Sequence, residues 1–159
     1  MLLKEIVTFG ESSLDRAAEV RSDISKLNRL LEDSNSGILP FWRGKPLVSG
    51  YARDSLVWLD QAHELFKYST QTPIFLGIEN GVARFASDIS KWIPEENIDS
   101  VGRFADTSEQ HFNGLPEDYR FSEVRSIMTT LTPIDAELVA TAKALINWHQ
   151  THKFCSSCG

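Results

Sequence analysis

The chain has 159 residues, of which 42% are hydrophobic and 24% are charged, and this is the composition of an ordinary globular domain. Its net charge of −6 argues against a nonspecific nucleic-acid binder, because such a protein needs a basic surface that displaces counterions. Charges interrupt every apolar stretch well short of the roughly 20 residues of a membrane-spanning helix. The N-terminus lacks the long apolar run of a secretory signal, so we expect a cytoplasmic protein without membrane partners.

The first third of the chain predicts a short strand and two helices. Residues 6–9 have the character of a strand, and residues 13–20 and 22–33 that of helices. Ser22 is the expected N-cap of the second helix, and Gly37 is expected to stop it. The apolar residues of that helix recur at helical spacing: Ile24, Leu27, Leu30 and Leu31.

The middle of the chain predicts strands joined by tight turns. Residues 38–42 and 47–48 flank a turn at 43–46, residues 55–59 form another β-like run, and residues 61–68 predict a short helix.

The clearest hairpin joins residues 73–79 and 82–88 through Asn80-Gly81. This dipeptide supplies the positive φ that both central positions of a type I′ turn require. Period-two alternation predicts a core-facing row on the first strand, formed by Ile74, Leu76 and Ile78.

The last part of the chain predicts a loop followed by two helices. Residues 92–116 have the glycines and prolines of irregular structure, and residues 121–128 read as a helix. A longer helix should begin behind Thr132 as N-cap, with Pro133 at its first position, and run to about Gln150. Its expected core-facing side consists of Leu138, Ala142, Leu145 and Trp148.

The order of these elements predicts an α+β fold, with a mostly antiparallel sheet, flanking helices and a long C-terminal helix. The four tryptophans suggest base stacking or core packing, and because they are scattered we expect core or interface packing for most. Arg43 and Lys45 form a basic turn, which we expect to be solvated rather than nucleotide-binding. His63 and His111 are expected to be ordinary surface residues.

The sequence ends in a C-x-x-C-G motif, formed by Cys155, Cys158 and Gly159. Two thiolates at this spacing bind one Zn²⁺ from adjacent corners of a tetrahedron, so the pair predicts half of a structural zinc site. The alternatives are free thiols on an exposed end, which is the expectation for this chain alone, and a redox pair. We expect His149 to pack at the helix end, and His152 to cap the helix or to face solvent, rather than to bind zinc.

A resemblance to a known family rests on this junction. Residues 148–159 resemble the W-H-x-x-H-x-F-C-x-x-C-G segment of NADH pyrophosphatases of the Nudix superfamily. Weaker likenesses lie at residues 39–47, 75–78 and 83–88 and at Val124-Arg125. The resemblance therefore runs from about Leu39 to Gly159, and we expect it to extend back to Phe9.

The resemblance implies a three-part protein. Residues 1–150 would be the N-terminal domain, with a degenerate Nudix-like fold, and residues 151–159 the start of a four-cysteine zinc ribbon that precedes a catalytic Nudix domain. Such proteins are homodimers that use Mg²⁺ or Mn²⁺ to hydrolyse NADH or NAD⁺ to nicotinamide mononucleotide and AMP, and bacterial members also remove NAD caps from RNA. Structural Zn²⁺ would bind Cys155 and Cys158, and Arg125 matches a position that contacts substrate.

The chain departs from the family at the catalytic segment. The Nudix box, whose glutamates hold the divalent ions that activate water, matches no part of the sequence. We therefore expect no catalytic residue here, an inactive fragment, and a truncation just past the cysteine pair. For Arg125 the alternative is an ordinary ion pair with Glu123 or Glu117, and for the whole chain it is a free-standing interaction or zinc-adaptor module.

Overall fold

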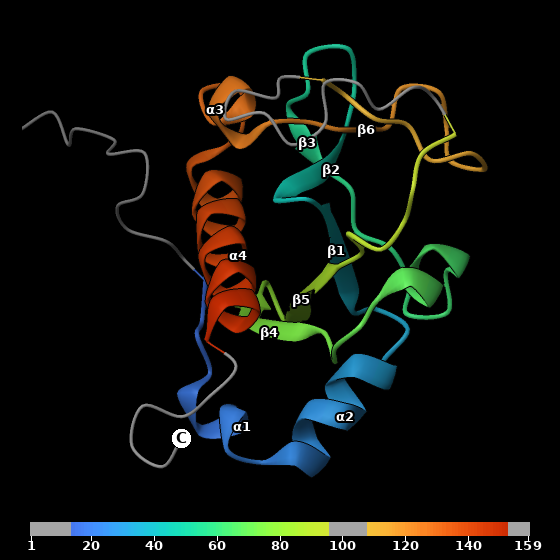
Figure 1. The fold of residues 1–159 in the computed structure, drawn as a ribbon. Coiled ribbons are helices and arrows are strands. Elements are labelled where there is room, and N and C mark those ends of the chain that lie inside the picture. The colour runs from blue at the N-terminus through green and yellow to red at the C-terminus, as the bar shows by residue number, and fades with distance from the viewer. Residues whose placement is uncertain (1–13, 96–107, 153–159) are drawn as a thin grey trace, which may run out of the picture.

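The computed structural model of the chain describes residues 14–95 and 108–152 (Figure 1). Helices and strands are mixed along the chain, which confirms the α+β prediction. The elements are α1 (Ala18–Arg21), α2 (Ile24–Glu32), β1 (Gly37–Trp42), β2 (Lys45–Ser49), β3 (Ser55–Leu56), the 3-10 helix η1 (Glu64–Tyr68), β4 (Ile74–Glu79), β5 (Val82–Asp88), β6 (Arg120–Phe121), α3 (Val124–Ile127) and α4 (Pro133–Thr151).

The described strands form one sheet in the order β3-β2-β1-β5-β4, and β6 also pairs with β2. The β1–β2, β2–β3, β2–β6 and β4–β5 pairs are antiparallel, so the prediction of a mostly antiparallel sheet is confirmed. The β1–β5 pair is parallel, and its register runs from Gly37 opposite Arg84 to Phe41 opposite Asp88. A parallel pair needs a long connection, and here β2, β3, η1 and β4 lie between its two strands.

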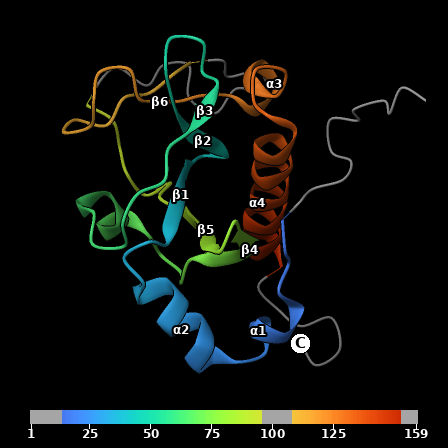
Figure 2. The same cartoon turned by 180° about the vertical axis from the view of Figure 1, so that it is seen from behind.

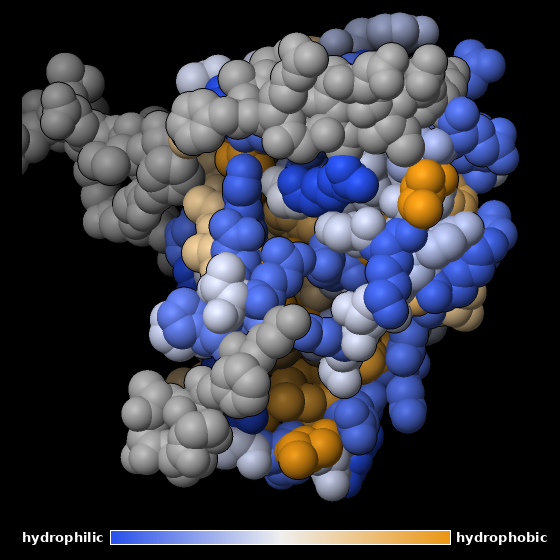
Figure 3. Space-filling model, viewed as in Figure 1, coloured by the Kyte–Doolittle hydropathy of each residue, from blue (hydrophilic) through white to orange (hydrophobic). Residues whose placement is uncertain are grey.

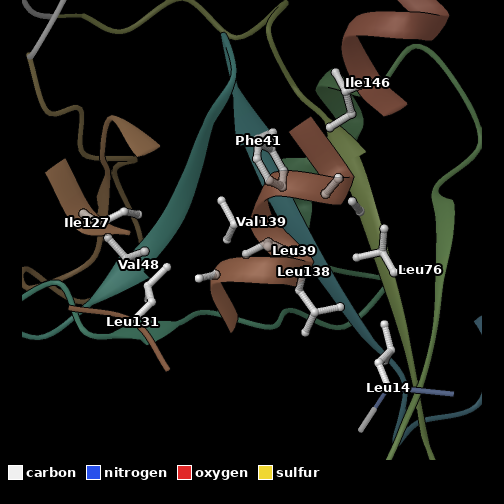
Figure 4. Close-up of a cluster of buried hydrophobic side chains, with 13 residues drawn as sticks. Leu14, Leu39, Phe41, Val48, Leu76, Ile127, Leu131, Leu138, Val139 and Ile146 are labelled. Atoms are coloured by element: carbon white, nitrogen blue, oxygen red, sulfur yellow. The ribbon is translucent and has the colours of Figure 1, made fainter. Parts of the chain in front are cut away.

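Strand β1 is buried along its whole length. Leu39 and Phe41 point to the face that α4 covers, where they pack with Leu138 and Val139 (Figure 4). In the two opposite views of Figures 1 and 2, α4 stands beside the sheet and α2 lies below it. Ile38 belongs to the cluster that α2 packs against, so β1 is covered by a different helix on each face.

A separate aromatic cluster packs against the far end of β1. Trp42 and Trp92 are buried, their ring centroids lie 5.8 Å apart, and Trp92 also contacts Phe112 and Phe121 at 5.2 and 5.8 Å. The indole N–H of Trp42 donates to the Trp92 carbonyl at 2.9 Å, which satisfies the polar atom of a buried ring. This cluster anchors the residues on both sides of the 96–107 segment to the sheet.

Two of the hairpin turns, β1–β2 and β4–β5, have the positive φ values that a two-residue type I′ turn requires. Asn80 and Gly81 have φ of 50° and 79°, which confirms the predicted turn between β4 and β5. Arg43 and Gly44 repeat it between β1 and β2, with φ of 50° and 77°.

Strand β4 does not present the predicted row of side chains to one face. Its register against β5 shifts between Phe75 and Gly77, and this bulge inserts one residue into the alternation. Leu76 consequently packs on the α4 side with Ile74, whereas Ile78 packs on the α2 side with Phe75. The prediction of one shared face is therefore wrong for Ile78.

The free edge of β4 is covered by the segment that leads into α1. Asp15 exchanges two backbone hydrogen bonds with Ile78, at 3.0 and 2.7 Å. The Arg21 guanidinium donates to the carbonyls of Phe75 and Leu76, at 2.8 and 2.9 Å. These contacts satisfy groups that an exposed edge strand would offer to another chain.

The N-terminal helices differ from the prediction. The N-cap of α2 is Asp23, whose carboxylate accepts from the Lys26 N–H at 3.0 Å, rather than Ser22. The helix ends at Glu32, and Gly37 opens β1 instead of stopping the helix. Of the helix predicted at residues 13–20, residues 14–17 are not helical and 18–20 belong to α1, because Asp15 pairs with Ile78 of β4. The strand predicted at residues 6–9 lies outside the described residues.

Two other predicted helices are shorter. Residues 61–68 give the 3-10 helix η1, which begins only at Glu64. Residues 121–128 divide into the end of β6 and the short helix α3, because Phe121 pairs with Leu47 of β2. For residues 121–128, pairing with the sheet overrides the local helical pattern.

Helix α4 begins as predicted and packs on a different set of residues near its end. The Thr132 hydroxyl accepts from the Asp135 N–H at 3.2 Å, which confirms the N-cap. The buried residues are Ala136, Leu138, Val139, Ala142 and Ile146. Trp148 is 56% exposed, so its predicted place in the core-facing row is wrong. Ile146 is the last buried residue, and the final turn extends beyond the core.

The surface of Figure 3 is mostly hydrophilic, and apolar side chains reach it only as separate spots, the lowest of them beside a hollow. An apolar hollow lies between α2 and the sheet. It is an apolar groove of about 330 Å³, lined by residues that include Leu27, Leu31, Phe75 and Phe85. No described helix is long and apolar enough to cross a membrane.

The bulge in β4 depends on a glycine. A Cβ at Gly77 would lie 2.5 Å from the Asp15 backbone oxygen, and the φ of 153° is one that other residues rarely adopt. We predict that Gly77→Ala lowers the free energy of unfolding by about 2–4 kcal/mol, the range for steric strain at such a site. Gly81→Ala, with positive φ but nothing within 4 Å, should cost about 1 kcal/mol. Equal losses in urea titrations would contradict a steric role of Gly77.

Candidate functional site

Arg125 lies in the first turn of α3, between β6 and α4 (Figure 1), and its side chain is exposed. Within residues 14–95 and 108–152 its guanidinium makes no ion pair. The pairing with Glu123 or Glu117 that the sequence left open is therefore not formed. The Glu123 carboxylate faces Lys143 of α4 instead, at 3.5 Å.

The backbone of α3 is fixed, although the Arg125 side chain makes no ion pair with any other described residue. Glu123 is the N-cap of the helix, and Ile127 is buried against α4 and β2 in the main core. At the far end, the Thr130 hydroxyl donates to the Arg53 carbonyl at 3.1 Å. Arg125 thus presents an exposed guanidinium on a short helix whose two ends are held by the rest of the domain.

The loop beside α3 is held by a charged network. The Arg53 guanidinium makes two hydrogen bonds to the Glu109 carboxylate, at 2.9 and 2.8 Å, and the Ser122 hydroxyl donates to the same carboxylate at 2.7 Å. The hydrogen bond from Arg53 holds the pKa of Glu109 below its ordinary value of 4.5, and the same bond raises the pKa of Arg53. This network joins the β2–β3 loop to residues 109–122.

Only one of the two basic residues of this turn is exposed to solvent. Arg43 is exposed as expected, but Lys45 is 3% exposed, so the solvated-turn prediction is wrong for Lys45. Its ammonium donates to the Ser108 carbonyl at 2.6 Å and lies 5.6 Å from the Trp42 ring centroid. The alternation of β2 turns Lys45 inward, where these contacts compensate for its burial.

The last turn of α4 is the described element that lies nearest in sequence to the cysteine pair. Cys155 and Cys158 themselves lie outside the described residues. The Gln150 amide donates to Asp88 at 2.9 Å, which links this turn to the end of β5. His152 stacks on Trp148 with ring centroids 3.6 Å apart, and its Nδ1 lies 3.3 Å from the Trp148 carbonyl. His152 thus caps the helix as expected, whereas His149 is exposed and the packing expected for it is not found.

The isolated histidines have structural roles that the sequence did not indicate. His63 accepts from the Leu65 N–H through Nδ1 at 3.2 Å and so caps η1. His111 places Nε2 3.1 Å from the Leu115 carbonyl. Of the tryptophans, Trp42 and Trp92 are buried as expected and Trp148 is exposed.

No three His, Cys, Asp or Glu side chains of residues 14–95 and 108–152 come close enough together to hold a metal ion. Asp135, in the first turn of α4, is the described carboxyl whose pKa is raised, chiefly because burial disfavours its charged form. Glu79 adds to this effect, while Thr132 and Arg84 oppose it.

Comparison with known proteins gives two findings. The family model described as "NADH pyrophosphatase-like rudimentary NUDIX domain" matches residues 35–148, which is most of the chain and includes Arg125. Over 39 residues the chain is 46% identical to the human mitochondrial NAD(P)H pyrophosphatase NUDT13. That alignment covers 24% of this chain and 11% of the human protein, so the chain spans only a small part of this relative.

The two shifted carboxyls should affect stability with opposite dependence on pH. Ionised Glu109 stabilises the fold above its ordinary pKa, and this contribution is lost as pH falls. Glu109→Gln should therefore lower the free energy of unfolding by about 0.5 kcal/mol near neutral pH, the scale of an exposed ion pair, and by less below about pH 4. Asp135 is favoured in its neutral form, so its ionisation costs stability as pH rises through the raised pKa.

Asp135→Asn should accordingly gain stability relative to the parent chain as pH rises. Urea unfolding of the parent and both variants between about pH 3 and pH 7 measures these differences. Parallel pH profiles for the two variants would show that the assigned causes of the pKa shifts are wrong.

Proposed function

This chain belongs to the NADH pyrophosphatase-like rudimentary NUDIX domain family, and on this premise we propose that it is the non-catalytic N-terminal domain of an NAD(H) pyrophosphatase. The complete enzyme hydrolyses NADH or NAD⁺ to nicotinamide mononucleotide and AMP. The family match over residues 35–148 is the observation that carries the proposal. The name of the human relative, an NAD(P)H pyrophosphatase, supports the same substrate class.

The division of labour follows from the residues present. The sequence contains no Nudix box, and we assign the carboxylates that hold catalytic Mg²⁺ or Mn²⁺ to a separate Nudix domain of the complete enzyme. The N-terminal domain supplies shape and charge around the substrate. We also propose that the complete enzyme is a homodimer. NAD-capped RNA is a further proposed substrate, because the same dinucleotide is exposed at the end of such an RNA.

Arg125 is the residue that we assign to substrate. A dinucleotide pyrophosphate has negative charge and planar oxygen pairs, which a guanidinium binds with two hydrogen bonds. The free guanidinium on α3 suits this role, because Lys143 already engages the neighbouring Glu123. Binding then needs no internal ion pair to be broken.

Cys155 and Cys158 are assigned to a structural Zn²⁺ whose other two ligands lie further along the polypeptide. Cys155 comes three residues after His152 and Cys158 six residues after it, and the Gln150–Asp88 hydrogen bond ties the last turn of α4 to the sheet. The donor set fits zinc, since thiolates at this spacing are its preferred ligands. When bound, the ion holds two chain segments together and takes no part in hydrolysis.

The first test uses a longer protein that includes the residues after 159. With Mg²⁺ and NADH it should release AMP and nicotinamide mononucleotide, measured by chromatography, whereas the 159-residue chain should release none. Arg125→Ala should lower kcat/KM by about 10- to 100-fold, the scale of a charged hydrogen bond, and Arg125→Lys by less. Arg29→Ala, an exposed arginine on α2, is the matched control and should have no effect.

A longer protein that releases no AMP would contradict the pyrophosphatase function and favour the interaction-module alternative. Unchanged kinetics in Arg125→Ala, with activity present in the parent, would instead contradict only the assignment of Arg125.

The zinc assignment has an independent test. In the longer protein one Zn²⁺ per chain should protect the thiols of Cys155 and Cys158 from a thiol reagent, and Cys155→Ser should abolish tight binding. In the 159-residue chain two thiolates alone bind weakly, so equimolar Zn²⁺ should leave both thiols reactive. Equal protection in both proteins would contradict a four-ligand site completed downstream.

A further inference from the structure

A cavity of about 300 Å³ lies at the end of the sheet that holds the aromatic cluster, and its volume is within the range of small-molecule sites. It opens between η1 and two stretches of chain, residues 92–95 and 110–113. Arg125 is not among the described residues that line it. The cavity is therefore separate from the site proposed above, and what it binds does not depend on that function.

The described lining includes three aromatic side chains. Trp92 and Phe112 are buried, with ring centroids 5.2 Å apart, and Tyr68 meets Phe112 at 6.3 Å. The contacts of Phe112 with both rings are close to edge-on, at 61° and 73°. Ile93, which is 69% exposed, adds an apolar side chain at the rim.

Two carboxylates line the same cavity. Glu64 belongs to η1, and Glu95 accepts a hydrogen bond from the Asn113 amide at 3.3 Å. The cavity also contains one ammonium group, that of Lys67. It lies 3.7 Å from the Glu64 carboxylate and 5.1 Å from the centroid of the Tyr68 ring.

The position of Lys67 shows which chemistry this cavity accommodates. Its ammonium lies near both a carboxylate and an aromatic ring, the two kinds of group with which proteins bind amines. Lys67 is 57% exposed and tethered by a flexible stem, so it is easily displaced. The described lining has two carboxylates, Glu64 and Glu95, and one ammonium, Lys67, so one negative charge is not balanced by an ammonium.

We propose that this cavity binds a small organic ammonium ion with an apolar body, and that the ligand takes the place of the Lys67 ammonium. The ligand amine lies between Glu64 and Tyr68, and its hydrocarbon contacts the Ile93 and Phe112 side chains. The net charge of −6 attracts cations to the chain as a whole, while the rings select those with an apolar part. Since Glu64 and Lys67 are more than half exposed, we expect a dissociation constant of about 1–10 mM.

Titration of the isotopically labelled 159-residue chain, followed by amide NMR shifts, tests the proposal. The probe is pentylamine, with the neutral 1-pentanol and the anionic hexanoate as matched ligands. Pentylamine should shift the signals of residues 64–68, 92–95 and 110–113 in a saturable manner, and the other two ligands should not. Equal shifts with pentanol, or no saturable shift with pentylamine up to about 50 mM, would overturn the proposal.

Variants separate a defined site from general attraction to an acidic protein. Glu64→Gln and Glu95→Gln should each weaken pentylamine binding by about 3- to 10-fold, and Lys67→Gln should tighten it by about 2- to 3-fold by removing the resident ammonium. Glu117→Gln, an exposed carboxylate that does not line the cavity, is the control and should change nothing. Weaker binding in Lys67→Gln, or equal effects of all three glutamate variants, would contradict displacement of Lys67.

Discussion

Burial of strand β1 on both faces is the constraint on which the other elements depend. All six of its residues are buried, and its neighbours are β2 on one edge and the parallel strand β5 on the other. Each large apolar side chain so buried contributes about 1.5–3 kcal/mol, but only if something covers it. Helix α4 covers one face, and α2 and the aromatic cluster cover the other. The position of α3, and with it that of Arg125, follows from the start of α4.

The sequence predicted those elements that local chemistry determines. Asn80-Gly81 and the Thr132 N-cap were identified because each needs only its immediate neighbours. The predictions failed where distant residues decide. The bulge at Gly77 depends on the approach of Asp15, and no periodicity within β4 reveals it. The loss of helix at residues 121–123 likewise depends on pairing with β2, which lies more than 70 residues away in the sequence.

The same division applies to the candidate site. The position of Arg125 came from a resemblance, and its short-range partners were reasonable guesses from the sequence. The structure shows that Glu123 pairs with Lys143, a residue of another helix that sequence spacing does not bring near. Burial of Lys45 also depends on a long-range contact, with Ser108. Residues 153–159, which contain the cysteine pair, lie outside the described structure, so the zinc assignment still rests on the sequence motif.

The parallel pairing of β1 with β5, and the cover that α4 provides, also govern the order in which the chain acquires structure during synthesis. β1 ends at Trp42, whereas β5 ends at Asp88 and α4 at Thr151. At 5–20 residues per second, a ribosome needs roughly 5–20 s after completing β1 to complete the helix that covers it. Until then Leu39, Phe41 and Val48 lack the α4 side chains with which they pack in the folded domain. The face of β1 that α4 covers therefore cannot be closed before the chain has been made as far as Thr151.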